Sequence, residues 1–216
     1  VIAVCLSARE VCSIKHKGLS SAQCRKKPGS TVIIAENPCQ LHYHDRFISY
    51  WMVLMPQSYI KRILDARVYD VARETPIDEA MLMSRRLGNR VLYKREDLQP
   101  VFSFKLRGAY NKMQKLTPEQ LACGVVTASA GNHAQGLAMA AQHMGVKATI
   151  VMPRTTPAIK VDAVRNRGAK VVLHGDTFDE ASVYAQKLVA EKSLVFVHPF
   201  DDPDIIAGQG TVGMEI

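Results

Sequence analysis

From residue 124 onward, short apolar runs rich in β-branched residues alternate with longer segments that have helical spacing. The apolar runs lie at 124–128, 148–152, 170–173 and 194–197. The segments between them predict helices at 132–144, 157–166 and 178–192, and a further helix starts at Asp204. Short strands that alternate with helices pair in parallel, and the helices then cover both faces of the sheet. We therefore predict an α/β fold with an open, mostly parallel sheet and helices on both faces.

Residues 59–123 precede this alternation and contain more helix signals than strand signals. Apolar spacing predicts a short helix near 60–68, a helix at 80–87 that ends at Gly88, and a helix at 104–116. The short apolar run at 91–94 predicts a strand. Thr117 and Gln120 have the spacing of a capping box around Pro118, so we expect another helix to start there.

Residues 1–54 follow neither the strand period nor the helix period, and we interpret them as an atypical N-terminal extension. A misread start upstream of a natural Met55 would explain this change in character, and a transit peptide is the alternative. The cysteines of this part are spaced too widely for the close pairs of a zinc site, although two histidines follow them. These residues are Cys5, Cys12, Cys24, Cys39, His42 and His44. We predict no metal site, and we expect the isolated Cys123 to be a small buried residue.

Composition narrows the class of protein. The 216 residues are 47% hydrophobic and 22% charged, which is ordinary for a globular protein. The net charge of +8 raises the question of nucleic acid or anionic membrane as a partner. The basic residues after residue 54 are scattered among acidic ones, and no apolar run approaches the ~18 residues of a membrane span. We therefore predict neither nucleic-acid nor membrane binding. The odd number of cysteines and the lack of a clean secretory signal favour the cytoplasm.

Two segments carry the candidate chemistry. Lys105 lies between Phe104 and Leu106 at the start of a predicted helix. Burial disfavours a charged amine, and a neutral amine condenses with an aldehyde. Residues 129–133 are small or polar and lie between a strand and a helix, where backbone N–H groups bind anions. An amine nucleophile beside an anion site is the arrangement that a pyridoxal-phosphate enzyme needs to act on an amino acid.

Residues 103–109, around Lys105, resemble the cofactor-lysine motif of the fold-type II pyridoxal-phosphate enzymes. Residues 129–136 resemble the substrate and cofactor loop of the same family. The flanks at 94–101 and 109–113, together with 162–165 and 206–211, are most similar to the biosynthetic threonine dehydratases. The resemblance covers roughly Gln57 to Ile216 and implies a fold like that of the tryptophan synthase β-subunit.

We expect residues 55–216 to be the N-terminal portion of such a catalytic domain, incomplete at the C-terminus. The glycine-rich phosphate loop of the family, and any regulatory domain, would follow Ile216. The resemblance implies pyridoxal 5'-phosphate as cofactor and deamination of L-threonine to 2-oxobutanoate and ammonia, the first step of isoleucine biosynthesis. Serine dehydratase or serine racemase activity, with L-serine as substrate, and an inactive fragment are the alternatives. We expect the full-length form to be a homo-oligomer.

The resemblance also implies roles for individual residues. Lys105 would hold the cofactor and then remove the Cα proton of the substrate. Phe104 would pack against the cofactor ring, and Asn132 would hydrogen-bond its ring hydroxyl. The substrate carboxylate would be bound by Ser129, Ala130, Gly131, Asn132 and His133. The residues alone leave other interpretations open: Phe104 in the core, Asn132 as a helix cap, and Gly131 in a tight turn. We expect His133 to orient the loop rather than act as a base.

Several other polar residues have open interpretations. Arg107 fits a phosphate ligand and a structural ion pair equally well. The charged run 94–97 is typical of a solvated surface, although the resemblance suggests that it shapes the approach to Lys105. We expect Ser103 to cap the helix that carries Lys105. We interpret a scattered set of possible ligands as loop residues at strand ends, namely His174, His198, Asp201 and Asp202.

Overall fold

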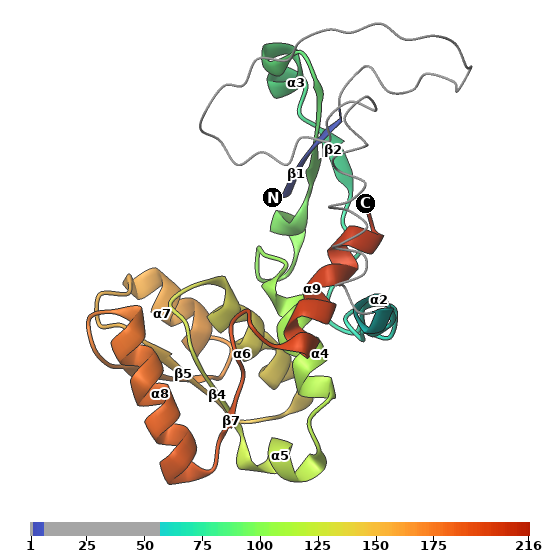
Figure 1. Cartoon of the computed structure of the whole chain (residues 1–216). Helices are drawn as coiled ribbons and strands as arrows, with labels where there is room; N and C mark the ends of the chain where they lie inside the picture. The colour runs from blue at the N-terminus through green and yellow to red at the C-terminus, as the bar shows by residue number, and fades with distance from the viewer. Residues whose placement is uncertain (1, 7–56) are drawn as a thin grey trace, which may run out of the picture.

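The computed structural model of the chain describes residues 2–6 and 57–216 (Figure 1). The predictions for the N-terminal extension concern a start at Met55, the cysteines at 12, 24 and 39, and the histidines at 42 and 44. They lie outside the described residues.

A parallel sheet forms the centre of the larger part of the chain. Its four strands follow the order β6 (Lys170–Leu173), β5 (Ala148–Met152), β4 (Val125–Ala128) and β7 (Val195–Phe196). Every neighbouring pair in this order is parallel. All four residues of β4 are buried, as expected for a strand covered on both faces. The predicted parallel sheet is therefore confirmed.

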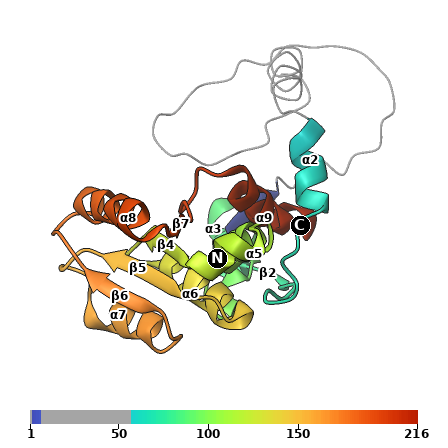
Figure 2. The ribbon, with the colours of Figure 1, turned by 90° about the horizontal axis from the view of Figure 1, so that it is seen from below.

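Helices cover both faces of this sheet, as predicted. Figure 2 shows α8 (Phe178–Lys192) on one side, with α6 (Asn132–Met144) and α7 (Ala158–Arg165) on the other. Successive residues of a strand point to opposite faces, so each strand contributes to two cores. In β5, Ile150 packs with the α6 and α7 side, whereas Val151 packs with the α8 side.

A second, antiparallel sheet lies away from the parallel one (Figure 1). Its central strand is β3 (Arg90–Lys94), which pairs with β1 (Ile2–Leu6) on one edge and β2 (Ile77–Glu79) on the other. The helix α3 (Met81–Leu87) joins β2 to β3 and ends at Gly88, whose φ of 63° is left-handed. The predicted helix and β3 are confirmed. We did not predict β1, β2 or the 3-10 turn η2 (Glu96–Leu98).

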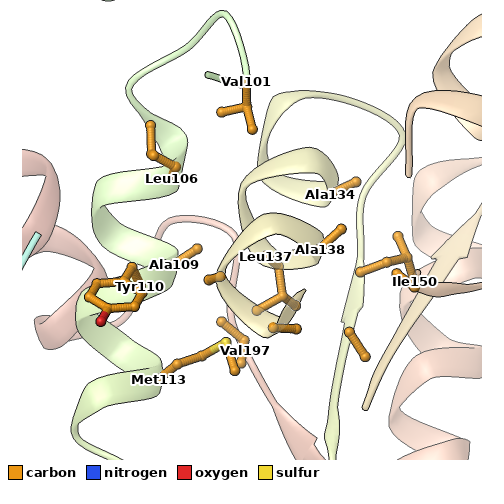
Figure 3. Packing of buried hydrophobic residues seen from close by; sticks show 14 of the residues in the cluster. Val101, Leu106, Ala109, Tyr110, Met113, Ala134, Leu137, Ala138, Ile150 and Val197 are labelled. Carbon is orange, nitrogen blue, oxygen red and sulfur yellow. The ribbon is translucent and has the colours of Figure 1, made fainter. Parts of the chain in front are cut away.

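Three further helices follow one another outward from α6. They are α4 (Lys105–Gln114), which packs against α6, α9 (Pro203–Met214), which packs against α4, and α2 (Gln57–Leu64), which packs against α9. Figure 3 shows apolar side chains of α4 and α6 facing one another, among them Ala109 and Leu137. On its other side α4 crosses α9 at Gly208. The backbones are so close there that a Cβ at Gly208 would lie 2.7 Å from the Arg107 carbonyl oxygen. Among the described residues, no helix has both the length and the apolarity that crossing a membrane requires.

The helix α5 (Pro118–Cys123) begins with the predicted capping box. The Thr117 backbone N–H donates to Gln120 Oε1 at 2.9 Å, and the Gln120 N–H donates to Thr117 Oγ1 at 3.3 Å. The prediction for Cys123 is wrong, because its side chain is exposed. Cys123 is the last residue of the exposed helix α5, and the buried strand begins only at Val125.

Candidate active site

Lys105 is the first residue of α4, and its side chain reaches the segment that follows the carboxyl end of β7. Its backbone N–H donates to Ser103 Oγ at 3.1 Å. The prediction of Ser103 as the cap is wrong, because Phe104 holds the position before the first helical residue and makes no side-chain cap. The half-buried side chain donates from Nζ to the Pro199 carbonyl at 3.1 Å. Burial lowers the pKa of the Lys105 amine. Burial therefore makes this amine lose its proton more readily than an exposed lysine does.

Phe104 lies directly beside the amine. Its ring centroid is 5.6 Å from Lys105 Nζ, and its side chain is half-buried. An aromatic face at this place is available to a planar ring that approaches the amine. This position supports the role that the resemblance implies for Phe104.

Of the motif 129–133, residues 129–131 connect β4 to α6, and the last two residues begin α6. Ser129 N–H donates to the Val151 carbonyl at 3.0 Å, and the Gly131 N–H donates to Ser129 Oγ at 3.3 Å. Gly131 holds the position before the first helical residue and makes no side-chain cap. The interpretation of Asn132 as the cap is therefore wrong. Asn132 is the first residue of α6, and its side chain is exposed.

Gly131 is not required by a tight turn, which was another of our interpretations. Its φ of −139° is not the positive φ for which a turn favours glycine. A Cβ at this position would meet no atom within 4 Å, so the space beside Gly131 is open. Open space above the N-terminal N–H groups of a helix suits an anionic ligand. These features fit the carboxylate of an amino acid.

Gly136 brings the loop and the lysine together. A Cβ at Gly136 would lie 2.9 Å from the Leu106 nitrogen and 3.0 Å from the Lys105 carbonyl oxygen. The first turn of α6 therefore lies against the first turn of α4 with no room for a larger residue. The two motifs, which are separated in the sequence, meet in one site.

His133 lies in the interior of the protein, next to the loop of residues 129–131. Its ring is buried, and Nε2 lies 3.4 Å from the Val197 carbonyl oxygen, so this nitrogen carries the proton. Burial, with smaller effects of Lys105 and His198, lowers the pKa of His133 to about 4. A ring with this pKa is neutral at pH 7 and is a weak base. The geometry supports an orienting role.

Arg107 does not reach the open side of this site. Its guanidinium is 0% exposed and bonds Glu96 twice, from Nε to Oε2 at 2.9 Å and from Nη2 to Oε1 at 2.9 Å. It also donates from Nη2 to Glu215 Oε2 at 3.0 Å. Of the two interpretations that the sequence left open, the ion pair is the one that the structure contains.

The charged run 94–97 is only half solvated, so its interpretation as a surface run is wrong for two residues. Lys94 is buried with its Nζ 2.7 Å from Glu215 Oε2, and Glu96 is buried against Arg107. Arg95 and Asp97 stay near the surface and pair with each other at 2.9 Å. Burial of Glu215 would raise its pKa, but hydrogen bonds led by Arg107 and Lys94 lower it to about 2. Two cations and two carboxylates therefore form a neutral buried network.

The scattered polar residues near strand ends have other partners. His174 stacks on Tyr184 with ring centroids 4.0 Å apart. Asp202 caps α9 and accepts the N–H of Asp204 at 2.8 Å. His198 Nδ1 accepts the N–H of Asp201 at 2.7 Å. Within the described residues, no group of three or more His, Cys, Asp or Glu side chains could hold a metal ion.

A half-buried lysine beside a helix N-terminus, at the carboxyl end of a parallel sheet, defines the class of protein. The family described as "Pyridoxal-phosphate dependent enzyme" matches residues 68–216. The chain belongs to this family, and the predicted cofactor is therefore confirmed as that of the family. Lys105, Phe104 and the open space beside Gly131 are suited to hold such a group.

Curated relatives of the chain narrow the family further. The chain is 60% identical to "Threonine dehydratase biosynthetic, chloroplastic" of Arabidopsis thaliana, over 74% of this chain and 27% of that protein. It is 60% identical to "L-threonine dehydratase biosynthetic IlvA" of Burkholderia multivorans, over 74% of this chain and 32% of the relative. These relatives confirm the resemblance to the biosynthetic threonine dehydratases.

Solved structures confirm the fold. Threonine deaminase isoform 2 of Solanum lycopersicum superimposes with a TM-score of 0.69 at 55% identity, over 73% of this chain and 44% of that one. Maize serine racemase has a TM-score of 0.69 at 34% identity, over 72% of this chain and 48% of that one. The chain thus spans less than half of these structures and about a third or less of the curated relatives.

Proposed function

We propose that the chain is the N-terminal portion of a threonine dehydratase that deaminates L-threonine to 2-oxobutanoate and ammonia. The observation that carries the proposal is the half-buried Lys105 amine, which is held by the Pro199 carbonyl and lies against the loop that starts α6. The identity of 52% to 60% with curated threonine dehydratases supports this substrate over others.

The residues of the chain have distinct tasks in this proposal. Lys105 binds the cofactor through Nζ and, once released by the substrate, takes the Cα proton on the same nitrogen. A positioned base of this kind contributes about 10²–10⁴-fold to the rate. Pyridoxal phosphate, when bound, supplies an electron sink for the charge left on Cα. The lowered pKa of Lys105 supports this role, because a charged amine could not accept the proton.

The loop binds the substrate in the same proposal. Ser129 contributes its hydroxyl group, because its own N–H is donated to the Val151 carbonyl, and Ala130 and Gly131 bring backbone N–H groups toward the carboxylate. These contacts orient the Cα–H bond toward Lys105. Asn132 and His133 complete the set: the exposed amide of Asn132 contacts the cofactor ring hydroxyl as well, and the buried His133 keeps the loop in place. Phe104 packs on the cofactor ring.

Replacing Lys105 tests the proposal. In the full-length protein, Lys105→Ala should abolish 2-oxobutanoate formation from L-threonine and the attachment of pyridoxal phosphate to this position after borohydride reduction. Lys115→Ala is the matched control, because Lys115 follows the same helix and is exposed. Full turnover by Lys105→Ala would overturn the assignment.

Serine racemase is the second candidate activity, because maize serine racemase superimposes on this chain as well as threonine deaminase does. L-threonine and L-serine should be compared side by side, with chiral detection of D-serine. A clear preference for L-serine, or D-serine as the main product, would favour this second candidate. If the full-length protein binds pyridoxal phosphate at Lys105 but turns over neither substrate, the chain belongs to a non-catalytic relative.

We also propose a cytoplasmic location and a homo-oligomeric full-length form, with residues 55–216 as part of the catalytic domain and residues 1–54 as an extension. The names of two relatives, from Arabidopsis thaliana and Schizosaccharomyces pombe, include "chloroplastic" and "mitochondrial". Cell fractionation therefore tests the location, and N-terminal sequencing of the native protein tests whether residues 1–54 are retained. Light scattering of the full-length protein tests the oligomeric state.

A further inference from the structure

The segment that follows β7 contacts both halves of the candidate site through its backbone. The Val197 carbonyl oxygen lies 3.4 Å from His133 Nε2, which belongs to the substrate loop. Two residues later, the Pro199 carbonyl accepts the hydrogen bond from Lys105 Nζ at 3.1 Å. Both Val197 and Pro199 are buried. The direction of these two carbonyl groups therefore helps to set where the loop and the amine lie relative to each other.

His198, between these two residues, closes a turn on its own backbone. Its Nδ1 accepts the N–H of Asp201 at 2.7 Å and that of Phe200 at 3.3 Å. Accepting these bonds requires an unprotonated Nδ1. The ring also packs edge-on against Phe200, with centroids 4.7 Å apart, and against Phe196, with centroids 6.0 Å apart. Pro199 lies inside this turn, so the turn determines where its carbonyl points.

Both ends of the turn are anchored independently of His198. On one side, β7 pairs with β4 in the parallel sheet. On the other side, Asp202 caps α9 and lies 2.7 Å from Lys112 Nζ, which belongs to the same helix as Lys105. A change at His198 should therefore alter the turn without releasing the strand or the helix.

We propose that His198 is a positioning residue, which holds the Pro199 carbonyl as the acceptor for the Lys105 amine whenever that amine is bound to neither cofactor nor substrate. The inference rests on the proposed function, because it takes Lys105 as the reacting amine. A lysine side chain has four flexible carbons. A hydrogen bond to a fixed carbonyl selects one arrangement of them and so sets the direction in which the nitrogen faces the site.

Two substitutions separate the acceptor from the ring. His198→Asn keeps an acceptor near the place of Nδ1, since an asparagine Oδ1 accepts the N–H two residues later in a turn. His198→Phe keeps the aromatic ring between Phe196 and Phe200 but removes the acceptor. Far-ultraviolet circular dichroism of each full-length variant verifies that it is folded.

The experiment follows the amine directly and does not depend on turnover. The full-length protein, stripped of cofactor, is mixed with pyridoxal phosphate, reduced with borohydride after set times, and mapped by mass spectrometry. The amine and the aldehyde join with loss of water, and reduction fixes the product as a secondary amine on the lysine. Amide hydrogen exchange of the segment that contains Phe200 and Asp201 reports on the turn.

We expect His198→Phe to slow labelling of Lys105 about tenfold or more, since small misplacements of reacting groups have effects of up to about 10²-fold. Exchange of the 200–201 amides should become faster. His198→Asn should label within about twofold of the natural protein. Labelling of Lys115 should be the same in all variants, because this lysine is exposed.

Other outcomes overturn the inference. Normal labelling of Lys105 in His198→Phe would show that the acceptor has no positioning role. Slow labelling in His198→Asn, whether or not His198→Phe is also slow, would assign the effect to the ring or to the fold. If the natural protein itself shows no label at Lys105, the proposed function fails, and this result is distinct from a failure confined to the variants.

Discussion

Arg107→Met should destabilise the chain more than any surface substitution, because Arg107 is the centre of the buried charge network. The guanidinium is 0% exposed and bonds both oxygens of Glu96, Glu215 and the hydroxyl of Thr211 at 3.1 Å. Methionine has a similar length but cannot donate. The substitution leaves two buried carboxylates with Lys94 as the cation of the network.

Two arguments set the size of the effect. Removing one partner of a buried ion pair costs about 3–5 kcal/mol, since the other partner stays buried and unpaired. The pKa of Glu215 falls from its ordinary value of 4.5 to about 2 through hydrogen bonds led by Arg107, against the opposing effect of burial. This shift of 4.5 minus about 2 corresponds to about 3 kcal/mol at ~1.4 kcal/mol for each pKa unit. Hydrogen bonds from Lys94 and Tyr69 also lower this pKa and remain in the variant, so about 3 kcal/mol is the upper bound of the Glu215 contribution. Together with the broken pair to Glu96, we expect a loss of about 3 kcal/mol at pH 7.

The pH dependence has a definite sign. A lowered carboxyl pKa contributes stability that is present above about pH 4.5 and is lost as the pH falls through about 2. In Arg107→Met the pKa of Glu215 should rise, so this carboxyl takes up a proton in the folded state at a higher pH. The difference between the natural chain and the variant should therefore be largest near pH 7 and smaller below pH 4.5.

Urea denaturation followed by circular dichroism, at pH 7 and again below pH 4.5, measures the effect. Arg165→Met is the control, because Arg165 pairs with Asp162 at 3.4 Å on the surface of α7 with 53% and 59% of the two side chains exposed. The control should change the free energy of unfolding by less than ~1 kcal/mol. A loss for Arg107→Met no greater than that of the control at pH 7 would refute the reasoning.

Two other substitutions test the contacts of the site. Gly136→Ala should push α4 away from α6, because the new Cβ would lie 2.9 Å from the backbone of α4. We expect it to lower the free energy of unfolding by about 1–3 kcal/mol and to slow labelling of Lys105 by pyridoxal phosphate. Gly213→Ala, whose Cβ would meet no atom within 4 Å, should be neutral or gain up to ~1 kcal/mol, and equal urea midpoints for the two variants would contradict this prediction. His133→Gln should flatten the loss of stability between pH 6.5 and pH 4, because a histidine whose pKa is lowered to about 4 stabilises the fold above pH 6.5 and loses this effect as the pH falls. The natural chain should lose about 2–3 kcal/mol more than the variant between pH 7 and pH 4.5 in urea denaturation, and parallel acid profiles would show that His133 is not the group responsible.

Elements whose signals are local were predicted well. The helix at Asn132–Met144 and the strand at Ala148–Met152 have the predicted bounds, and the left-handed Gly145 at φ 67° ends that helix. The short strands β1 and β2 were missed, because they depend on pairing with β3 rather than on their own residues. The burial of Cys123 was predicted wrongly, because this residue ends the exposed helix α5 two positions before the buried strand begins.

The motifs of the sequence identified the residues of the candidate site. They did not predict how the folded chain brings these residues together. Lys105 and the loop 129–133 stood out by residue type and by resemblance. Gly136 belongs to the motif 129–136, but the motif does not explain why glycine is needed there. The need arises from helix packing, because the backbone of Leu106 lies against this position. The Pro199 carbonyl that holds the Lys105 amine gave no signal, since backbone acceptors look alike in a sequence.

The sequence by itself determined the alternation of strands and helices and the parallel sheet, because these follow from local period and residue type. It also singled out Lys105 as the candidate reactive lysine, through residue type and family resemblance. The tertiary structure alone decided the partners of charged residues. Arg107 and Glu215 are 108 positions apart, and only the crossing of α4 and α9 brings them together. A charge is stable in the interior only where opposite charges and hydrogen-bond partners converge on it. Such convergence is a property of the packed chain, and no local pattern records it.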